Sequence, residues 1–115
     1  MNIKKLEKIY KEIKQTEKAE NEVNYISRLE ILNFFMDIDE FQTLNNETKR
    51  VLIEGVYFFW IQSYYSIETC EEMTKIIFEE KSSFAVKLRN NSITVKDVAS
   101  LLTQNEKRLD DIQYC

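Results

Sequence analysis

The side chains of this chain that are capable of acid–base chemistry are carboxylates, and several of them occur in close pairs. The pairs are Asp37 and Asp39, Glu71 and Glu72, Glu79 and Glu80, and Asp110 and Asp111. Neighbouring residues on a helix point about 100° apart, so such pairs are usually solvated surface groups and not catalytic dyads. The chain has no histidine, which removes the usual general base and the commonest metal ligand. We therefore predict that the protein is not an enzyme and has no catalytic residue and no cofactor.

The sequence also predicts no metal site and no phosphate-binding loop. Asp37 and Asp39 have the spacing of the first two ligands of an EF-hand calcium loop. The later positions, where that loop needs an oxygen ligand, a glycine and a glutamate, hold Phe41, Gln42 and Thr48. A glycine-rich phosphate loop is excluded because the chain contains one glycine.

The two cysteines, Cys70 and Cys115, lie far apart and lack the Cys-x-x-Cys spacing of redox and zinc motifs. The simplest interpretation is two reduced thiols in a cytosolic protein. The alternatives are a disulfide between the two, and an intermolecular bridge through the last residue. The sequence does not decide whether either thiol is ever oxidised.

Residues 94–113 resemble a helix-turn-helix pattern over about a sixth of the chain. The residues that fall where the motif places its apolar and small side chains are Val98, Ala99, Leu102, Leu109 and Ile112. The sequence departs from the motif at the turn, where Thr103 replaces the usual glycine. The second helix of the pattern carries three acidic residues and only two basic ones, Lys107 and Arg108. This balance leaves little positive charge to engage phosphates. We therefore favour a plain amphipathic helix or hairpin that closes a bundle.

Any binding surface must be positioned by the apolar run at residues 51–65, VLIEGVYFFWIQSYY. Wound as a helix, this run leaves only a narrow polar stripe at Glu54, Gly55 and Gln62, and such helices are normally buried among others. We predict a central aromatic-rich helix at about 47–65. Aromatic surface in excess of what the core needs would form a protein-binding patch, since Tyr and Trp are enriched at interfaces. The residues assigned to this patch are Tyr57, Trp60, Tyr64, Tyr65, Glu68, Glu71 and Glu72.

Helical periodicity recurs along the rest of the chain, and the absence of proline favours helices joined by short polar loops. We predict an all-α fold, a compact bundle of about five helices, with residues 1–115 as a single domain. Residues 2–38 form either one long helix or two, because the polar stretch in their middle contains no breaker. Thr94 is predicted to cap the last helix, with Asp97 completing a capping box.

Charge and targeting signals point to an ordinary cytoplasmic protein. The formal net charge is −4, which disfavours broad nucleic-acid binding without excluding it. The N-terminus is charged and amphipathic and does not resemble a secretory signal. The longest apolar run is far shorter than the roughly 20 residues that span a membrane.

Two functional hypotheses follow. The first is a small helical protein that binds a protein partner of unknown identity and inhibits or regulates it. Immunity proteins and phage or mobile-element inhibitors are similar in size and composition. The alternative is a DNA-binding transcriptional regulator that uses residues 94–113, and a homodimer is compatible with either hypothesis.

Overall fold

The computed structural model describes residues 2–14 and 22–113, and 82% of this part of the chain is helical, with no strand. Its eight helices are α1 (Ile3–Lys14), α2 (Glu22–Phe35), α3 (Asp39–Gln42), α4 (Asn46–Ser63), α5 (Ile67–Glu79), α6 (Ser83–Arg89), α7 (Val95–Gln104) and α8 (Glu106–Gln113). The all-α prediction is confirmed, but the described residues contain eight helices where about five were predicted. The difference arises because α3, α6 and α8 are short and follow their neighbours after brief connections.

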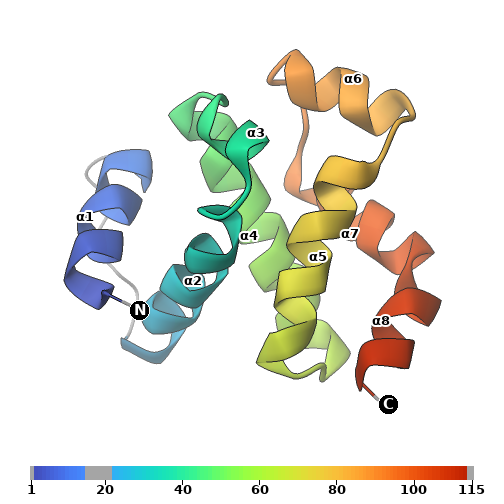
Figure 1. Ribbon diagram of the computed structural model, residues 1–115, viewed down its shortest axis with the longest axis horizontal. Coiled ribbons are helices and arrows are strands. Elements are labelled where there is room, and N and C mark those ends of the chain that lie inside the picture. The colour runs from blue at the N-terminus through green and yellow to red at the C-terminus, as the bar shows by residue number, and fades with distance from the viewer. Residues whose placement is uncertain (1, 15–21, 114–115) are drawn as a thin grey trace.

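The helix that covers the aromatic run is α4, and it packs against α1, α2, α5 and α7. In Figure 1, α1 and α2 lie on one side of α4, and α5, α7 and α8 lie on the other. Asn45 begins α4 by accepting a hydrogen bond from the Thr48 amide at 2.8 Å. The helix ends where Tyr64 takes the left-handed conformation, with φ at 59°, a position that usually favours glycine.

The first two helices are separate elements. Because α1 and α2 pack against each other, residues 2–38 are not one continuous rod. The connection between the two, residues 15–21, lies outside the described residues.

A hydrophobic cluster draws at least one buried side chain from every helix. Phe35 of α2 forms its aromatic centre, with its ring stacked 4.7 Å from Phe41 and edge-on at 6.2 Å to Phe78. The radius of gyration is 13.4 Å, close to the value of about 13 Å typical of compact domains of roughly 100 residues. No described helix combines the length and the apolarity that crossing a bilayer requires.

The capping box predicted for the last part of the chain is confirmed. The Thr94 hydroxyl accepts from the Asp97 amide at 3.1 Å, and the Asp97 carboxylate accepts from the Thr94 amide at 3.0 Å. This pair of bonds fixes the start of α7, the helix that forms one half of the surface described next.

Candidate protein-binding site

The contact between α4 and α7 depends on Gly55. A Cβ atom at this position would lie 2.6 Å from the Cβ of Val98, closer than side-chain carbons approach in proteins. The missing side chain therefore lets α7 pack against the α4 backbone. The atoms closest to Gly55 belong to the side chain of Val98, so the glycine is a point of close packing as well as part of the polar stripe.

Apolar side chains remain exposed beside this contact. Phe58 is 44% exposed and Ile61 is 51% exposed, both on the second half of α4. Phe58 and Val95 line two adjoining hollows of about 410 and 540 Å³, which also include Ile61 and Ala99. We call these four residues, Phe58, Ile61, Val95 and Ala99, the α4–α7 face.

A largely buried polar network lies at one of these hollows, whose lining includes Arg28 and Glu54. The Arg28 Nε donates to both carboxylate oxygens of Glu54, at 2.9 and 3.1 Å, and the Tyr10 hydroxyl donates to Glu54 Oε1 at 2.7 Å. The Arg28 guanidinium also lies 4.2 Å from the centre of the Tyr57 ring. Because Tyr10, Arg28 and Glu54 come from α1, α2 and α4, the network joins three helices at one point.

The Tyr10 hydroxyl stays a donor in this network. Burial raises the pKa of Tyr10 well above its ordinary value, and the hydrogen bond to the Glu54 carboxylate raises it further. The phenol therefore remains protonated throughout the physiological range. An arginine suits the position of Arg28, because its planar guanidinium can bind the Glu54 carboxylate with its edge while its face stacks on the Tyr57 ring.

The seven residues that the sequence assigned to a binding patch do not form one surface. Tyr57 is buried under Arg28. The Trp60 indole N–H donates to the Tyr65 carbonyl at 2.8 Å, and the Tyr65 hydroxyl donates to Asp110 of α8. Tyr64 alone among the aromatic residues of the patch is fully accessible, with 93% of its surface exposed.

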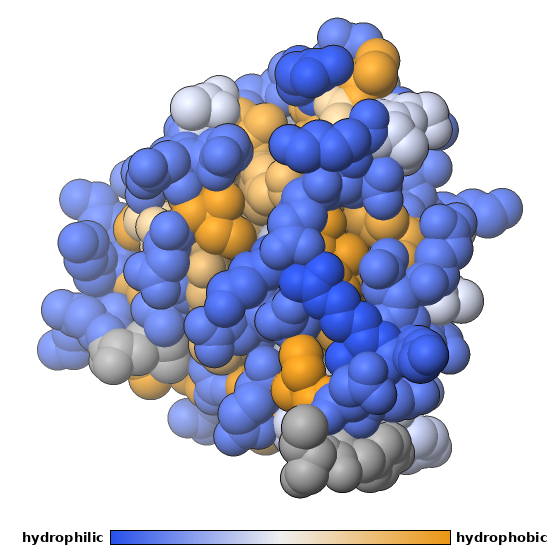
Figure 2. Space-filling model, turned by 45° about the vertical axis from the view of Figure 1, so that its right-hand side comes forward, coloured by the Kyte–Doolittle hydropathy of each residue, from blue (hydrophilic) through white to orange (hydrophobic). Residues whose placement is uncertain are grey.

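The three glutamates of that patch lie on α5 in different settings. Arg108 of α8 donates to Glu72 at 2.8 Å, and Glu71 pairs with Lys75 at 3.6 Å. Hydrogen bonds from its own backbone amide and from Ser66 lower the pKa of Glu68 below the ordinary range. Figure 2 shows the side of the molecule that carries α5 and α8, where hydrophilic residues dominate and apolar ones show in several areas between them.

Phe58 and Ile61 were missing from the sequence-based patch, although a signal for them was present. Residues at intervals of four and three share a helix face, so Phe58 and Ile61 lie on the same face as Glu54. Glu54 and Gln62 had already marked that face as the polar stripe. The two apolar residues that interrupt the stripe are exposed.

Residues 94–113 form two helices, but the connection between them differs from that of a helix-turn-helix motif. α7 continues through Thr103 and Gln104, where the motif would turn, and Asn105 alone separates it from α8. The motif uses a turn of about three or four residues. Arg108 of α8 is held by both Glu72 and Glu79, with a 2.7 Å bond to the second. This geometry gives the DNA-binding hypothesis no support, and it stays a prediction.

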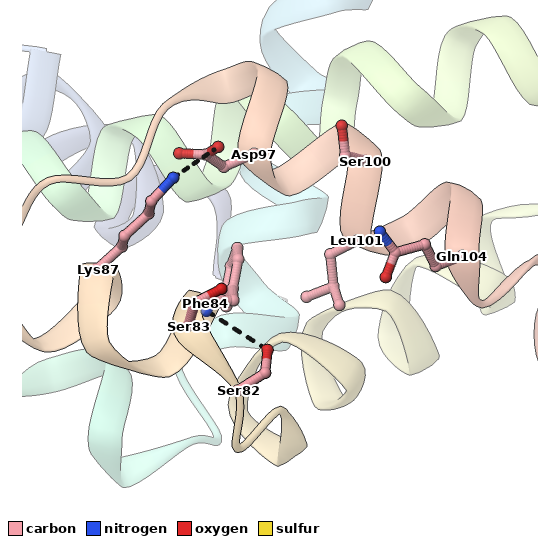
Figure 3. Close-up of a pocket in the computed structure, with 8 residues that line it drawn as sticks. All are labelled: Ser82, Ser83, Phe84, Lys87, Asp97, Ser100, Leu101 and Gln104. Carbon is pink, nitrogen blue, oxygen red and sulfur yellow. Dashed lines mark hydrogen bonds and ion pairs between the residues drawn. The ribbon is translucent and has the colours of Figure 1, made fainter.

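A third hollow, between α6 and α7, is smaller than the two at the α4–α7 face and has an ion pair among its lining residues. Figure 3 shows Lys87 reaching from α6 to Asp97 of α7, and this ion pair measures 3.4 Å. Asp97 is also occupied by the capping box of α7. The volume of about 190 Å³ lies below the range of roughly 300–1,000 Å³ typical of ligand pockets. We therefore assign this hollow a structural role.

The other side chains that could take part in chemistry are either buried or far from one another. Cys70 is a free and fully buried thiol, and burial raises its pKa to about 12. Such a thiol stays protonated and unreactive at neutral pH. Cys115, its partner in the disulfide alternative, lies outside the described residues. Among residues 2–14 and 22–113, no three side chains of metal-ligand type converge.

Comparison with known proteins adds no further evidence about function. No family model, no curated protein and no solved structure matches this chain.

Proposed function

We propose that this protein binds a protein partner through the α4–α7 face and inhibits or regulates it by occupying the partner's surface. The observation that carries the proposal is the joint exposure of Phe58 and Ile61 beside Val95 and Ala99. Single exposed apolar residues are common on protein surfaces, but a cluster that spans two helices and lines adjoining hollows is typical of an interface. Tyr64, one turn beyond Ile61, extends the accessible surface of α4.

This mode of action resembles that of immunity proteins and phage or mobile-element inhibitors, to which the chain is similar only in size and composition. A protein of this kind needs a rigid surface and no catalytic group. The lack of histidine is compatible with such a role, and we place the protein in the cytoplasm as part of the same proposal. A five-helix bundle with α4 at its centre, excluding the short α3, α6 and α8, remains our description of the scaffold.

Affinity capture with matched variants tests the proposal. The protein is immobilised as wild type, as Ile61→Asp and as Val86→Asp, and each is exposed to an extract of the organism that encodes the chain. Val86 on α6 is the control, because it is 48% exposed and lies outside the α4–α7 face. An aspartate at position 61 should lower partner affinity about 100-fold, since it replaces apolar contact with a desolvated, unpaired charge.

The expected result is a protein retained by the wild type and by Val86→Asp but lost with Ile61→Asp. Circular dichroism of the three proteins establishes that each is folded. Identical sets of captured proteins for Ile61→Asp and the wild type would show that the α4–α7 face is not the binding site.

A further inference from the structure

Two tyrosines meet where α1 packs against α2, and their hydroxyls differ. The ring of Tyr10 on α1 lies 5.6 Å from the ring of Tyr25 on α2, and both side chains are buried. The Tyr10 hydroxyl donates to the Glu54 carboxylate at 2.7 Å. Among the buried side-chain nitrogen and oxygen atoms of the described residues, the Tyr25 hydroxyl alone has no hydrogen-bond partner. A buried hydroxyl in this state weakens the contact that covers it, because water would bond to it if it were exposed.

The helix that covers the Tyr25 hydroxyl is α1. Its Tyr10 ring lies against the Tyr25 ring, and Glu7 precedes Tyr10 by one helical turn. Burial raises the pKa of Tyr25, and the charge of the Glu7 carboxylate raises it further, which places Glu7 near the hydroxyl. Detaching α1 would therefore return the hydroxyl to water, and the hydrogen bond gained there favours the detached state.

The rest of the fold has contacts that do not depend on α1. In Figure 1, α1 lies at one end of the molecule, and α2 and α4 separate it from α5, α7 and α8. Its own buried side chains are three, Leu6, Tyr10 and Ile13. The stacking of Phe35 with Phe41 and the close contact of Gly55 with Val98 include no residue of α1. Helices at the edge of a fold can open locally while a core of this kind stays intact.

The position of α1 connects this opening to the α4–α7 face. Lys14, the last residue of α1, lines the same hollow as Phe58 and Ile61, so α1 forms part of the wall of that hollow. We propose that α1 is a movable wall: it detaches from α2 and α4 while the other described helices stay folded, and the α4–α7 face widens. The importance of this opening for partner binding rests on the proposed function.

Hydrogen exchange of backbone amides, measured by NMR on the full-length protein, tests the inference. In the wild type, the amides of residues 9–13 should exchange about 100-fold faster than the slowest amides of α4, because detaching α1 needs less free energy than global unfolding. Their exchange should also respond less to added urea, since detaching one helix exposes less surface than unfolding the whole chain.

Three substitutions of tyrosine by phenylalanine separate the two hydroxyls. Tyr25→Phe keeps the ring and removes the hydroxyl that lacks a partner, so it should slow exchange of the α1 amides about tenfold. Tyr10→Phe takes one donor from Glu54 and should speed exchange of the same amides about tenfold. Tyr64→Phe is the control, because this side chain is 93% exposed, and it should leave the exchange of α1 unchanged.

Two results would overturn the inference. Equal exchange rates for the α1 and α4 amides, with the same urea dependence, would show that α1 opens only when the whole chain unfolds. Unchanged or faster exchange in Tyr25→Phe would show that the hydroxyl finds an acceptor in solution, such as Glu7, and does not oppose the docking of α1. Because the measurement needs no partner, either failure would leave the capture experiment and the proposed function unaffected.

Discussion

Replacing Arg28 with alanine is expected to lower the free energy of unfolding by about 3–5 kcal/mol, the typical cost of removing one member of a buried ion pair. The side chain of Arg28 is 8% exposed and that of Glu54 is 19% exposed, so the remaining carboxylate would be largely shielded from water. The Tyr57 ring would also lose the guanidinium stacked 4.2 Å from its centre. Urea denaturation followed by circular dichroism measures the change.

Two controls separate burial from charge. Arg108→Ala removes two ion pairs, to Glu72 and Glu79, whose arginine is 41% exposed, and it should cost only about 1 kcal/mol. The double variant Arg28→Met, Glu54→Leu removes both charges and keeps apolar volume. It should be clearly more stable than Arg28→Ala, because no unpaired charge remains. Equal losses for Arg28→Ala and Arg108→Ala would show that the Arg28–Glu54 pair is not a buried anchor.

Replacing Gly55 with valine is expected to cost about 3 kcal/mol of unfolding free energy. The added side chain would begin 2.6 Å from the Val98 Cβ, and the atoms it meets belong to a stiff, β-branched side chain that cannot move aside. Forcing extra carbon atoms into packed contacts costs about 1–3 kcal/mol, and valine recovers only part of the helix propensity that glycine lacks.

Gly55→Ala should lower the free energy of unfolding less than Gly55→Val does, because alanine adds only one carbon and improves helix propensity by about 1 kcal/mol. The matched rescue is Gly55→Val combined with Val98→Ala, which makes room on α7 for the new side chain. Denaturation midpoints of the single and double variants measure the coupling. If Val98→Ala gives no rescue, α4 and α7 do not meet at this point and the α4–α7 face loses its structural basis.

The sequence contained enough local information to predict the elements that depend on neighbours in the chain. The periodicity of apolar residues identifies α4 to within two residues at its C-terminal end, and the Thr94–Asp97 capping box follows from spacing alone. The described residues contain more helices than predicted because single residues such as Asn105 separate helices without any strong breaker. Short helices of this kind are determined by packing more than by propensity.

The features that define the candidate site are long-range and have no local signature. Arg28 and Glu54 are 26 residues apart, and the contact of Gly55 with Val98 joins α4 to a helix that begins 40 residues later. The arginine in an apolar stretch of α2 could be recognised as buried only once its carboxylate partner was located. Aromatic content suggested a binding patch, but the side chains that remain exposed depend on which faces α2, α5 and α8 cover.

Site-specific photo-crosslinking tests directly whether the α4–α7 face is the surface that binds a partner. A benzophenone amino acid replaces Ile61 in one protein and Val86 in another, and each is irradiated in an extract of the encoding organism. We expect a covalent adduct to one protein from position 61 and none from position 86. An adduct from position 86 with none from position 61 would contradict this assignment.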